Sequence, residues 1–202
     1  MLNLYAGIGG NRKLWKDVDV TAVEINSDIA KIYQEFFPDD EVIVTDAHKY
    51  LLENYDEYDF IWSSPPCPSH SRARYWGSFG ENRTKIYPDM KLYQEIIFLK
   101  HYYKSKWVVE NVKGYYEPLI KPQEISRHYF WSNFKINKKP FDTDFFPKDS
   151  LPTLEKIHRV DLSNLNVNIN KRVALRNCVN PELGKHIFNC AFKLVQKPLN
   201  CR

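Results

Sequence analysis

Hydrophobic residues recur along the first two thirds of the chain in short runs separated by longer amphipathic stretches. The short runs have the length and apolar content of strands. They fall at residues 2–6, 20–25, 41–46, 58–64 and 106–112. The stretches with apolar side chains at helical intervals fall at residues 27–37, 47–55 and 88–103, with a further helix beginning at residue 12. This alternation predicts an α/β fold, a doubly wound and mostly parallel sheet with helices on both faces.

The pattern weakens after residue 134. Residues 135–171 are rich in Asn, Asp, Lys and Pro and show little periodicity, which favours irregular structure. Helical periodicity resumes at Asn180 and Pro181, a pair typical of a helix start. We therefore expect an α/β unit at residues 1–134, a short irregular segment at 135–171 and a C-terminal segment at 172–202 that returns to the first unit.

Composition narrows the class of protein only slightly. The chain has 202 residues, 43% of them hydrophobic, which suits one domain with a substantial core. Its formal net charge of +4 is compatible with nucleic-acid binding but does not by itself indicate it. No segment has the apolar length of a membrane span and no signal peptide is evident, so we expect a cytoplasmic protein with no membrane partner. The four cysteines form no C-x-x-C pair, so we expect free thiols and no metal.

Candidate functional residues cluster where the predicted strands end. Ligands of parallel sheets collect at the carboxyl ends of the strands. The glycines of "AGIGG" would let backbone approach a ligand closely, although a simple tight turn is the alternative. Glu24, at the end of the second strand, suits the two hydroxyls of a ribose. Asp46, after the third, could accept from an adenine amino group or could cap the next helix.

Cys67 follows Pro65 and Pro66 at the end of the fourth strand. A free cysteine is more often a small buried hydrophobe, but two prolines would hold this one at a fixed angle. We expect Arg72, Arg74 or a helix amino terminus to lower its thiol pKa, as a nucleophile requires.

Glu110 and Asn111 end the fifth strand. A surface acid is the ordinary interpretation, yet a carboxyl at the mouth of an apolar strand is liable to have its pKa raised by desolvation. Such a group is a candidate proton donor beside a cysteine nucleophile.

The segments "LNLYAGIGG", "AVEIN", "SSPPCPSHSRAR", "VVENV", "PQEISRHYFWSNF" and "RNCVNPELGKHI" resemble the ordered motifs of the cytosine-C5 DNA methyltransferases. The resemblance extends from Leu2 to about Ile187. It implies a Rossmann-like fold of the S-adenosylmethionine-dependent methyltransferase type, with residues 1–134 as its catalytic and cofactor-binding unit. It also implies S-adenosylmethionine as cofactor and cytosine-containing DNA, in duplex form, as partner.

Site residues are carried over from the resemblance by their place in these motifs. The implied cofactor-binding residues are Tyr5, Ala6, Gly7, Gly9, Glu24, Ile25, Asp46, Pro66 and Asn177. The implied catalytic residues are Cys67, Glu110, Asn111 and Arg127. Cys67 would attack C6 of a flipped cytosine, Glu110 would protonate or hydrogen-bond N3, and Arg127 would help to position the pyrimidine.

The loop after the nucleophile mixes arginines with aromatic residues. It suits a segment that closes over a flipped base, and a solvated surface loop is the alternative. Its candidate nucleic-acid contacts are Ser69, His70, Arg72, Arg74 and Arg83.

The chain departs from the family at Pro68, Ile125 and Arg176, where Gln, Arg and Gly are usual. The largest departure is the short stretch in place of a target-recognition region. It can hardly form a separate core. The sequence therefore predicts a small family member that recognises little DNA sequence alone, or that depends on a second subunit or a homodimer for specificity.

Two other functions stay open from the sequence, and a third is disfavoured. The chain could methylate cytosine in tRNA, or it could be a non-catalytic nucleic-acid-binding subunit. An amino methyltransferase is disfavoured, because its S-P-P-aromatic motif has no cysteine. Restriction-modification, phage protection and regulation are all compatible settings, in a bacterial or phage-infected cell.

Overall fold

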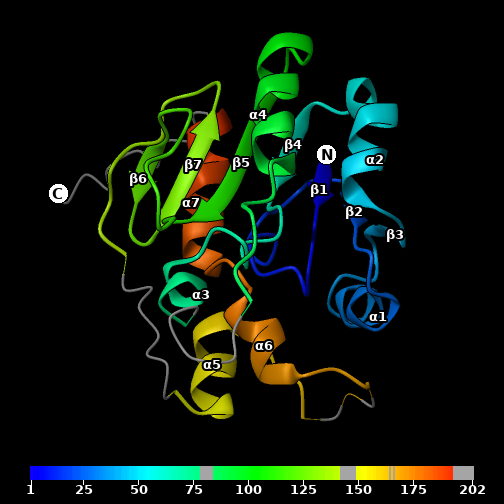
Figure 1. Ribbon diagram of the computed structural model, residues 1–202. Helices are drawn as coiled ribbons and strands as arrows, with labels where there is room; N and C mark the ends of the chain where they lie inside the picture. Colours follow the sequence, from blue (N-terminus) through cyan, green and yellow to red (C-terminus); the bar gives the residue numbers. More distant parts are fainter. Residues whose placement is uncertain (78–83, 142–148, 164, 166, 193–202) are drawn as a thin grey trace, which may run out of the picture.

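The computed structural model describes residues 1–77, 84–141, 149–163, 165 and 167–192, and its centre is a seven-stranded sheet (Figure 1). The strands are β1 (Leu2–Leu4), β2 (Thr21–Val23), β3 (Glu41–Ile43), β4 (Phe60–Ser63), β5 (Lys106–Val112), β6 (Gln123–Ile125) and β7 (His128–Ser132). Their order is β3-β2-β1-β4-β5-β7-β6. The first five are mutually parallel, whereas β7 and β6 run antiparallel. The mostly parallel α/β sheet predicted from the sequence is confirmed.

The helices cover both faces of this sheet (Figure 1). They are α1 (Ser27–Phe36), α2 (Ala47–Asn54), the 3-10 turn η1 (Tyr55–Glu57), α3 (Arg72–Gly77), α4 (Lys91–Tyr102), α5 (Leu151–His158), α6 (Lys171–Arg176) and α7 (Pro181–Phe192). One core lies between the sheet and α2 with α4. A second core lies between the opposite face and α7.

Strand β5 divides its side chains between these two cores. Trp107 and Val109 belong to the core of α2 and α4, whereas Val108 belongs to the core of α7. Because side chains alternate along a strand, Glu110 follows Val108 and Asn111 follows Val109. Glu110 and Asn111, near the end of β5, therefore lie on opposite faces of the sheet.

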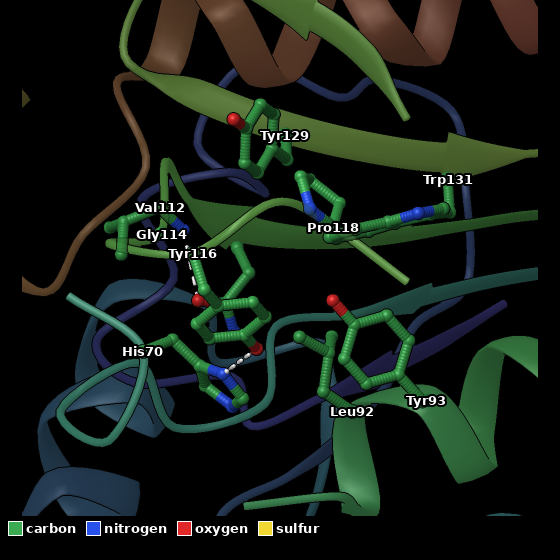
Figure 2. A pocket seen from close by; sticks show the side chains of 10 residues that line it. His70, Leu92, Tyr93, Val112, Gly114, Tyr116, Pro118, Tyr129 and Trp131 are labelled. Atoms are coloured by element: carbon green, nitrogen blue, oxygen red, sulfur yellow. Dashed lines mark hydrogen bonds between the residues drawn. The ribbon is translucent and has the colours of Figure 1, made fainter. Parts of the chain in front are cut away.

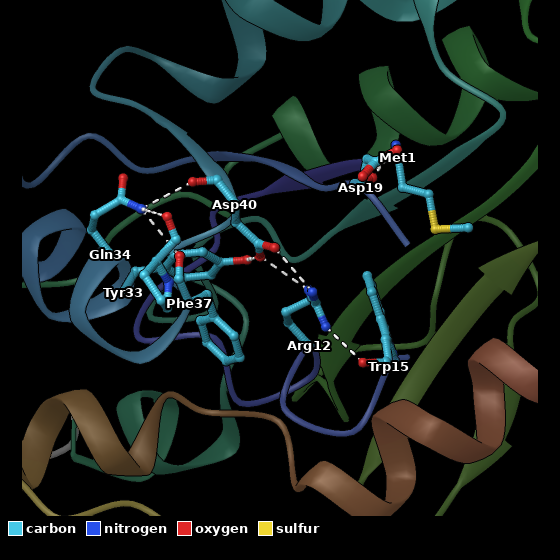
Figure 3. Close-up of polar contacts among 9 residues, drawn as sticks. Met1, Arg12, Trp15, Asp19, Tyr33, Gln34, Phe37 and Asp40 are labelled. Atoms are coloured by element: carbon cyan, nitrogen blue, oxygen red, sulfur yellow. Dashed lines mark hydrogen bonds and ion pairs between the residues drawn. The ribbon is translucent and has the colours of Figure 1, made fainter. Parts of the chain in front are cut away.

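The predicted helix at residue 12 is wrong, because residues 11–14 form turns. The side chain of Arg12 explains the difference (Figure 3). Its Nε and Nη2 donate to the carboxylate of Asp40 at 3.0 and 2.9 Å, and its Nη1 donates to the carbonyl of Trp15 at 2.8 Å. Tyr33 donates to the same carboxylate at 2.7 Å. These long-range bonds hold the segment in turns despite its helical pattern.

The stretch expected to be irregular contains α5, so that prediction is only partly right. Ser150 caps the helix, and Leu154 and Leu162 are fully buried against Ile8 and Ile32. Described apolar residues of this stretch pack against α1 and against Ile8 of the glycine loop, which no local periodicity reveals. Helix α1 begins at Ser27, as the periodicity predicts, and Asn26 caps it by accepting from the N–H groups of Asp28 and Ile29.

Candidate active site

The glycine loop after β1 adopts a backbone that few residues tolerate. Gly7 and Gly9 have φ angles of +55° and +81°, and Tyr5 has a φ angle of +54°. A Cβ on Gly9 would lie 2.2 Å from the ring of Phe37, and one on Gly10 would lie 2.5 Å from a backbone carbonyl oxygen in the segment after α6. Close packing as well as backbone conformation therefore requires glycine here.

Glu24 closes this loop onto the second strand. Its carboxylate accepts from the backbone N–H of Gly7 at 3.0 Å and of Asn26 at 2.9 Å. A carboxylate has about four acceptor positions, so two remain for hydroxyl groups. The geometry fits the ribose contact predicted for Glu24, and it adds a second role in holding the loop.

Apolar side chains are exposed beside Glu24. Ile25 is 68% exposed, and Val44, after β3, is also exposed. Asp46 caps α2 by accepting from the N–H of Lys49 at 3.1 Å and lies 3.8 Å from Lys91. The bond from Lys49 lowers the pKa of Asp46. The helix-cap alternative is thus present, and the adenine contact stays a prediction.

Cys67 lies on the corner after β4, half-buried, with its carbonyl accepting from His70 N at 2.9 Å and Ser71 N at 3.1 Å. Asn111 stabilises the corner by donating from Nδ2 to the carbonyl of Pro65 at 2.9 Å. Asn111 therefore supports the backbone next to Cys67. The exposed Pro66 completes the corner.

The expectation of a lowered thiol pKa is wrong. Burial, together with the nearby charge of Glu110, raises the pKa of Cys67 to about 11. Arg72 does not lower this pKa; its Nε donates to the carbonyl of Gly114 at 3.1 Å. The side chain of Arg74 lies outside the described part of the structure. The thiol is thus mostly protonated at neutral pH.

Glu110 behaves as the sequence suggests. Its side chain is on the strand next to β4, because Ser63 pairs with Val109 in the register of the sheet. Glu110 is 7% exposed, and desolvation raises its pKa to about 7, opposed by a hydrogen bond from Ser64. His128 Nε2 lies 3.7 Å from its Oε1. A carboxyl of this kind is half protonated at neutral pH and can donate a proton.

Arg127 and Asn177 lie at exposed ends of other elements. Arg127 is in the tight turn between β6 and β7, next to Ser126 with its φ of +52°, and its carbonyl accepts from Lys113 N at 3.1 Å. Asn177 is the C-cap of α6. The next residue, Cys178, packs against Gly10, so Asn177 lies near the glycine loop.

The predicted nucleic-acid contacts fall into different environments. His70 is 2% exposed, and its Nδ1 is bonded to the hydroxyl of Tyr116 at 2.6 Å (Figure 2). Burial lowers its pKa. Its position does not support direct contact with nucleic acid, because the ring anchors the loop internally. Ser69 accepts from Asp89 N at 3.0 Å, Arg72 is exposed, and Arg83 lies outside the described residues.

A small pocket opens beside His70 on the α4 side of the sheet (Figure 2). It is lined by His70, Leu92, Tyr93, Asn111, Val112, Gly114, Tyr116, Pro118, Tyr129 and Trp131. Cys67 and Glu110 do not line it. Since Glu110 follows the opposite face of β5, this pocket is not the place where those two residues meet.

Sequence reasoning missed one residue near the site, Glu95 on α4. It is buried and bonded to Tyr5, His48 and Ser63. The available signal was a charged residue on the apolar stripe of a helix, between Leu92 and Leu99. Such a position is unfavourable for an acid unless partners converge on it.

The described residues contain neither a metal-binding group nor a membrane-spanning helix. No group of three or more His, Cys, Asp or Glu side chains there could hold a metal ion. No helix in that part of the chain is both long and apolar enough to span a bilayer.

Comparison with known proteins identifies a family. Residues 1–121 match the family described as C-5 cytosine-specific DNA methylase. No curated protein sequence matches the chain.

Solved structures give weaker similarities. The methyltransferase EhMeth of Entamoeba histolytica is 18% identical, with a TM-score of 0.35 over 55% of this chain and 37% of that one. A DNMT2 mutant of Spodoptera frugiperda is 20% identical, with a TM-score of 0.45 over 85% of this chain and 60% of that one. The chain thus spans about a third of the first relative and three fifths of the second.

Proposed function

Because the chain belongs to the C-5 cytosine-specific DNA methylase family, we propose that it transfers a methyl group from S-adenosylmethionine to C5 of cytosine in DNA. Cys67 is the nucleophile and Glu110 the proton donor. One observation carries this assignment: the two residues lie at the ends of neighbouring strands, where Glu110 has a pKa of about 7 and its charge raises the pKa of Cys67.

These side chains suit the chemistry of a poorly nucleophilic carbon. Addition of the Cys67 thiolate to C6 forms a C–S bond and moves an electron pair toward C5, while protonated Glu110 donates to N3. C5 would then take the methyl group as its bond to the sulfonium sulfur breaks, which leaves S-adenosylhomocysteine. Loss of the C5 proton to water, return of the N3 proton to Glu110 and departure of the thiolate would restore the aromatic ring. The base must leave the stack for this, at a cost of a few kcal/mol.

The protonation states of Glu110 and Cys67 are coupled, because a negative charge on one disfavours a negative charge on the other. Ionised Glu110 raises the pKa of Cys67, so a protonated Glu110 lowers the free energy of the thiolate relative to the doubly ionised state. The reactive form therefore pairs a thiolate on Cys67 with a proton on Glu110. This is the protonation state that attack on C6 and donation to N3 both require.

The cofactor would lie along the ends of β1 and β2. Glu24 has acceptor positions left for ribose hydroxyls, and Ile25 offers an exposed apolar surface to an adenine ring. The glycine loop lets backbone approach the rest of the molecule. When bound, S-adenosylmethionine supplies an electrophilic methyl group on a sulfonium.

Recognition of a particular DNA sequence would require residues outside the described fold. The described apolar side chains of α5, α6 and the segment between them pack with Ile8 and α1, which leaves few of them for a separate recognition core. We therefore keep a second subunit, or a second copy of the chain, as the proposed source of sequence specificity.

The decisive experiment traps the covalent adduct. Duplex DNA containing 5-fluorocytosine is incubated with the protein and S-adenosylmethionine, because fluorine at C5 prevents release of the thiolate. We expect a denaturation-resistant adduct that Cys67→Ser abolishes. Transfer of labelled methyl is measured in parallel on duplex DNA and on tRNA.

Each alternative has its own outcome. Methyl transfer to tRNA alone would replace DNA as the substrate. Binding of nucleic acid without any transfer or adduct would identify a non-catalytic subunit and contradict the proposal.

A further inference from the structure

A buried carboxylate that the proposed chemistry does not use lies beneath the site. Glu95, in the middle of α4, is 1% exposed. Its Oε1 accepts from the hydroxyl of Tyr5 at 2.6 Å and lies 2.9 Å from Nδ1 of His48. Its Oε2 accepts from the hydroxyl of Ser63 at 2.6 Å. Both oxygens are thus engaged by side chains.

The three partners come from three different segments of the site. Tyr5 opens the glycine loop after β1, and Ser63 ends β4, four residues before Cys67. His48 lies in the first turn of α2, just after Asp46. One carboxylate therefore joins the loop predicted to bind the cofactor, the strand that carries the nucleophile and the helix capped by Asp46.

A carboxylate is energetically unfavourable on the buried apolar face of α4. Glu95 lies among the buried Leu92, Ile96 and Leu99, where an apolar side chain would avoid the desolvation of a charge. Tyr5 has a left-handed backbone, which is strained for a residue with a Cβ. Its short bond to a carboxylate is of the strong, charge-assisted kind and compensates for that strain.

We propose that Glu95 is a positioning residue for methyl transfer, which holds the Tyr5 turn of the cofactor loop and the Ser63 end of β4 at a fixed separation. The proposal rests on the proposed function. It goes beyond that function by assigning the alignment of cofactor loop and nucleophile to a side chain that touches neither substrate. The raised pKa of His48, caused first by its bond to Glu95, agrees with a tightly held cluster.

Two conservative variants each remove one hydrogen bond to Glu95. Tyr5→Phe removes the bond on the cofactor side, and Ser63→Ala removes the one on the nucleophile side. The matched control is Tyr33→Phe, because Tyr33 also donates to a buried carboxylate, Asp40, at 2.7 Å. Affinity for S-adenosylhomocysteine is measured by calorimetry, together with Tm, kcat and KM.

We expect Tyr5→Phe to weaken S-adenosylhomocysteine binding by about 10-fold, whereas Tyr33→Phe changes it less than about 2-fold at a comparable loss of Tm. Ser63→Ala should lower kcat by about 10-fold with a nearly unchanged KM for the cofactor. Glu95→Gln, which keeps the size of the side chain, should show both effects.

Equal S-adenosylhomocysteine affinity in the wild type, Tyr5→Phe and Tyr33→Phe would reduce Glu95 to a structural role and overturn the inference. If Glu95→Gln does not fold, the two single-hydroxyl variants decide. A wild type that neither binds S-adenosylhomocysteine nor transfers methyl would reject the proposed function and this inference together. An active wild type with unaffected variants would reject only the inference.

Discussion

Two buried glutamates near the carboxyl ends of the strands have opposite surroundings. Glu95 collects hydrogen bonds from two hydroxyls and an imidazole. Glu110 is nearly as buried, but desolvation outweighs the hydrogen bond it receives from Ser64 and raises its pKa to about 7. Both side chains are buried, and they differ in the number of hydrogen-bond donors that face them. A well-bonded acid can hold elements together, whereas a poorly bonded one is prepared to carry a proton.

The largest expected effect separates the two acids by activity. Glu110→Gln should lower kcat for methyl transfer by about 1,000-fold, because it removes the donated proton, whereas Glu95→Gln should cost about 10-fold. Single-turnover transfer of labelled methyl to DNA measures both. Similar losses in the two variants would contradict the division of roles.

The next effect separates them by stability. Glu95→Leu should lower the free energy of unfolding by about 2–4 kcal/mol, because it leaves the hydroxyls of Tyr5 and Ser63 without an acceptor. Glu110→Leu at pH 8 should be neutral or stabilising. Denaturant unfolding at that pH tests the contrast, and a stabilised Glu95→Leu protein would refute it.

The pH dependence of the free energy of unfolding tests the raised pKa of Glu110 directly. The pKa of Glu110 is raised from 4.5 to about 7 in the fold, so the native state binds more protons than the unfolded state between these values. Stability from this group is complete below about pH 4.5 and is lost as the pH rises through 7. The loss should be about 3 kcal/mol, measured as the difference between wild type and Glu110→Gln as the pH rises from below 4.5 to above 7. A pH-independent difference would rule out the raised pKa.

The smallest effect concerns the thiol. Because the charge of Glu110 contributes to the pKa of about 11 at Cys67, Glu110→Gln should shift alkylation of Cys67 to lower pH, by about one unit or less. Iodoacetamide labelling of the Cys67 peptide, followed by mass spectrometry, measures the shift. Glu95→Gln is the control and should leave the profile in place.

Much of the site was predictable because it depends on local patterns. Prolines before Cys67 mark a rigid corner, and an acid at the end of an apolar strand marks a desolvated carboxyl. The pKa of Cys67 was not predictable in the same way. The pKa is raised by burial and by the charge of Glu110, and both depend on how the strands and loops pack around the thiol. His70, expected at the surface, is buried for a similar reason, since Tyr116 lies 46 positions away in the sequence.

The sequence by itself determined the succession of strands and helices, the strand-end positions of Cys67, Glu110 and Glu24, and the family. These features follow from residue type, spacing and backbone preference, which act over a few positions. Only the tertiary structure decided which acid is surrounded by hydrogen-bond donors, because the partners of Glu95 come from positions 32 to 90 residues away. The chemistry of each carboxyl depends on how many donors surround it, and that number exists only once the sheet and its helices have packed.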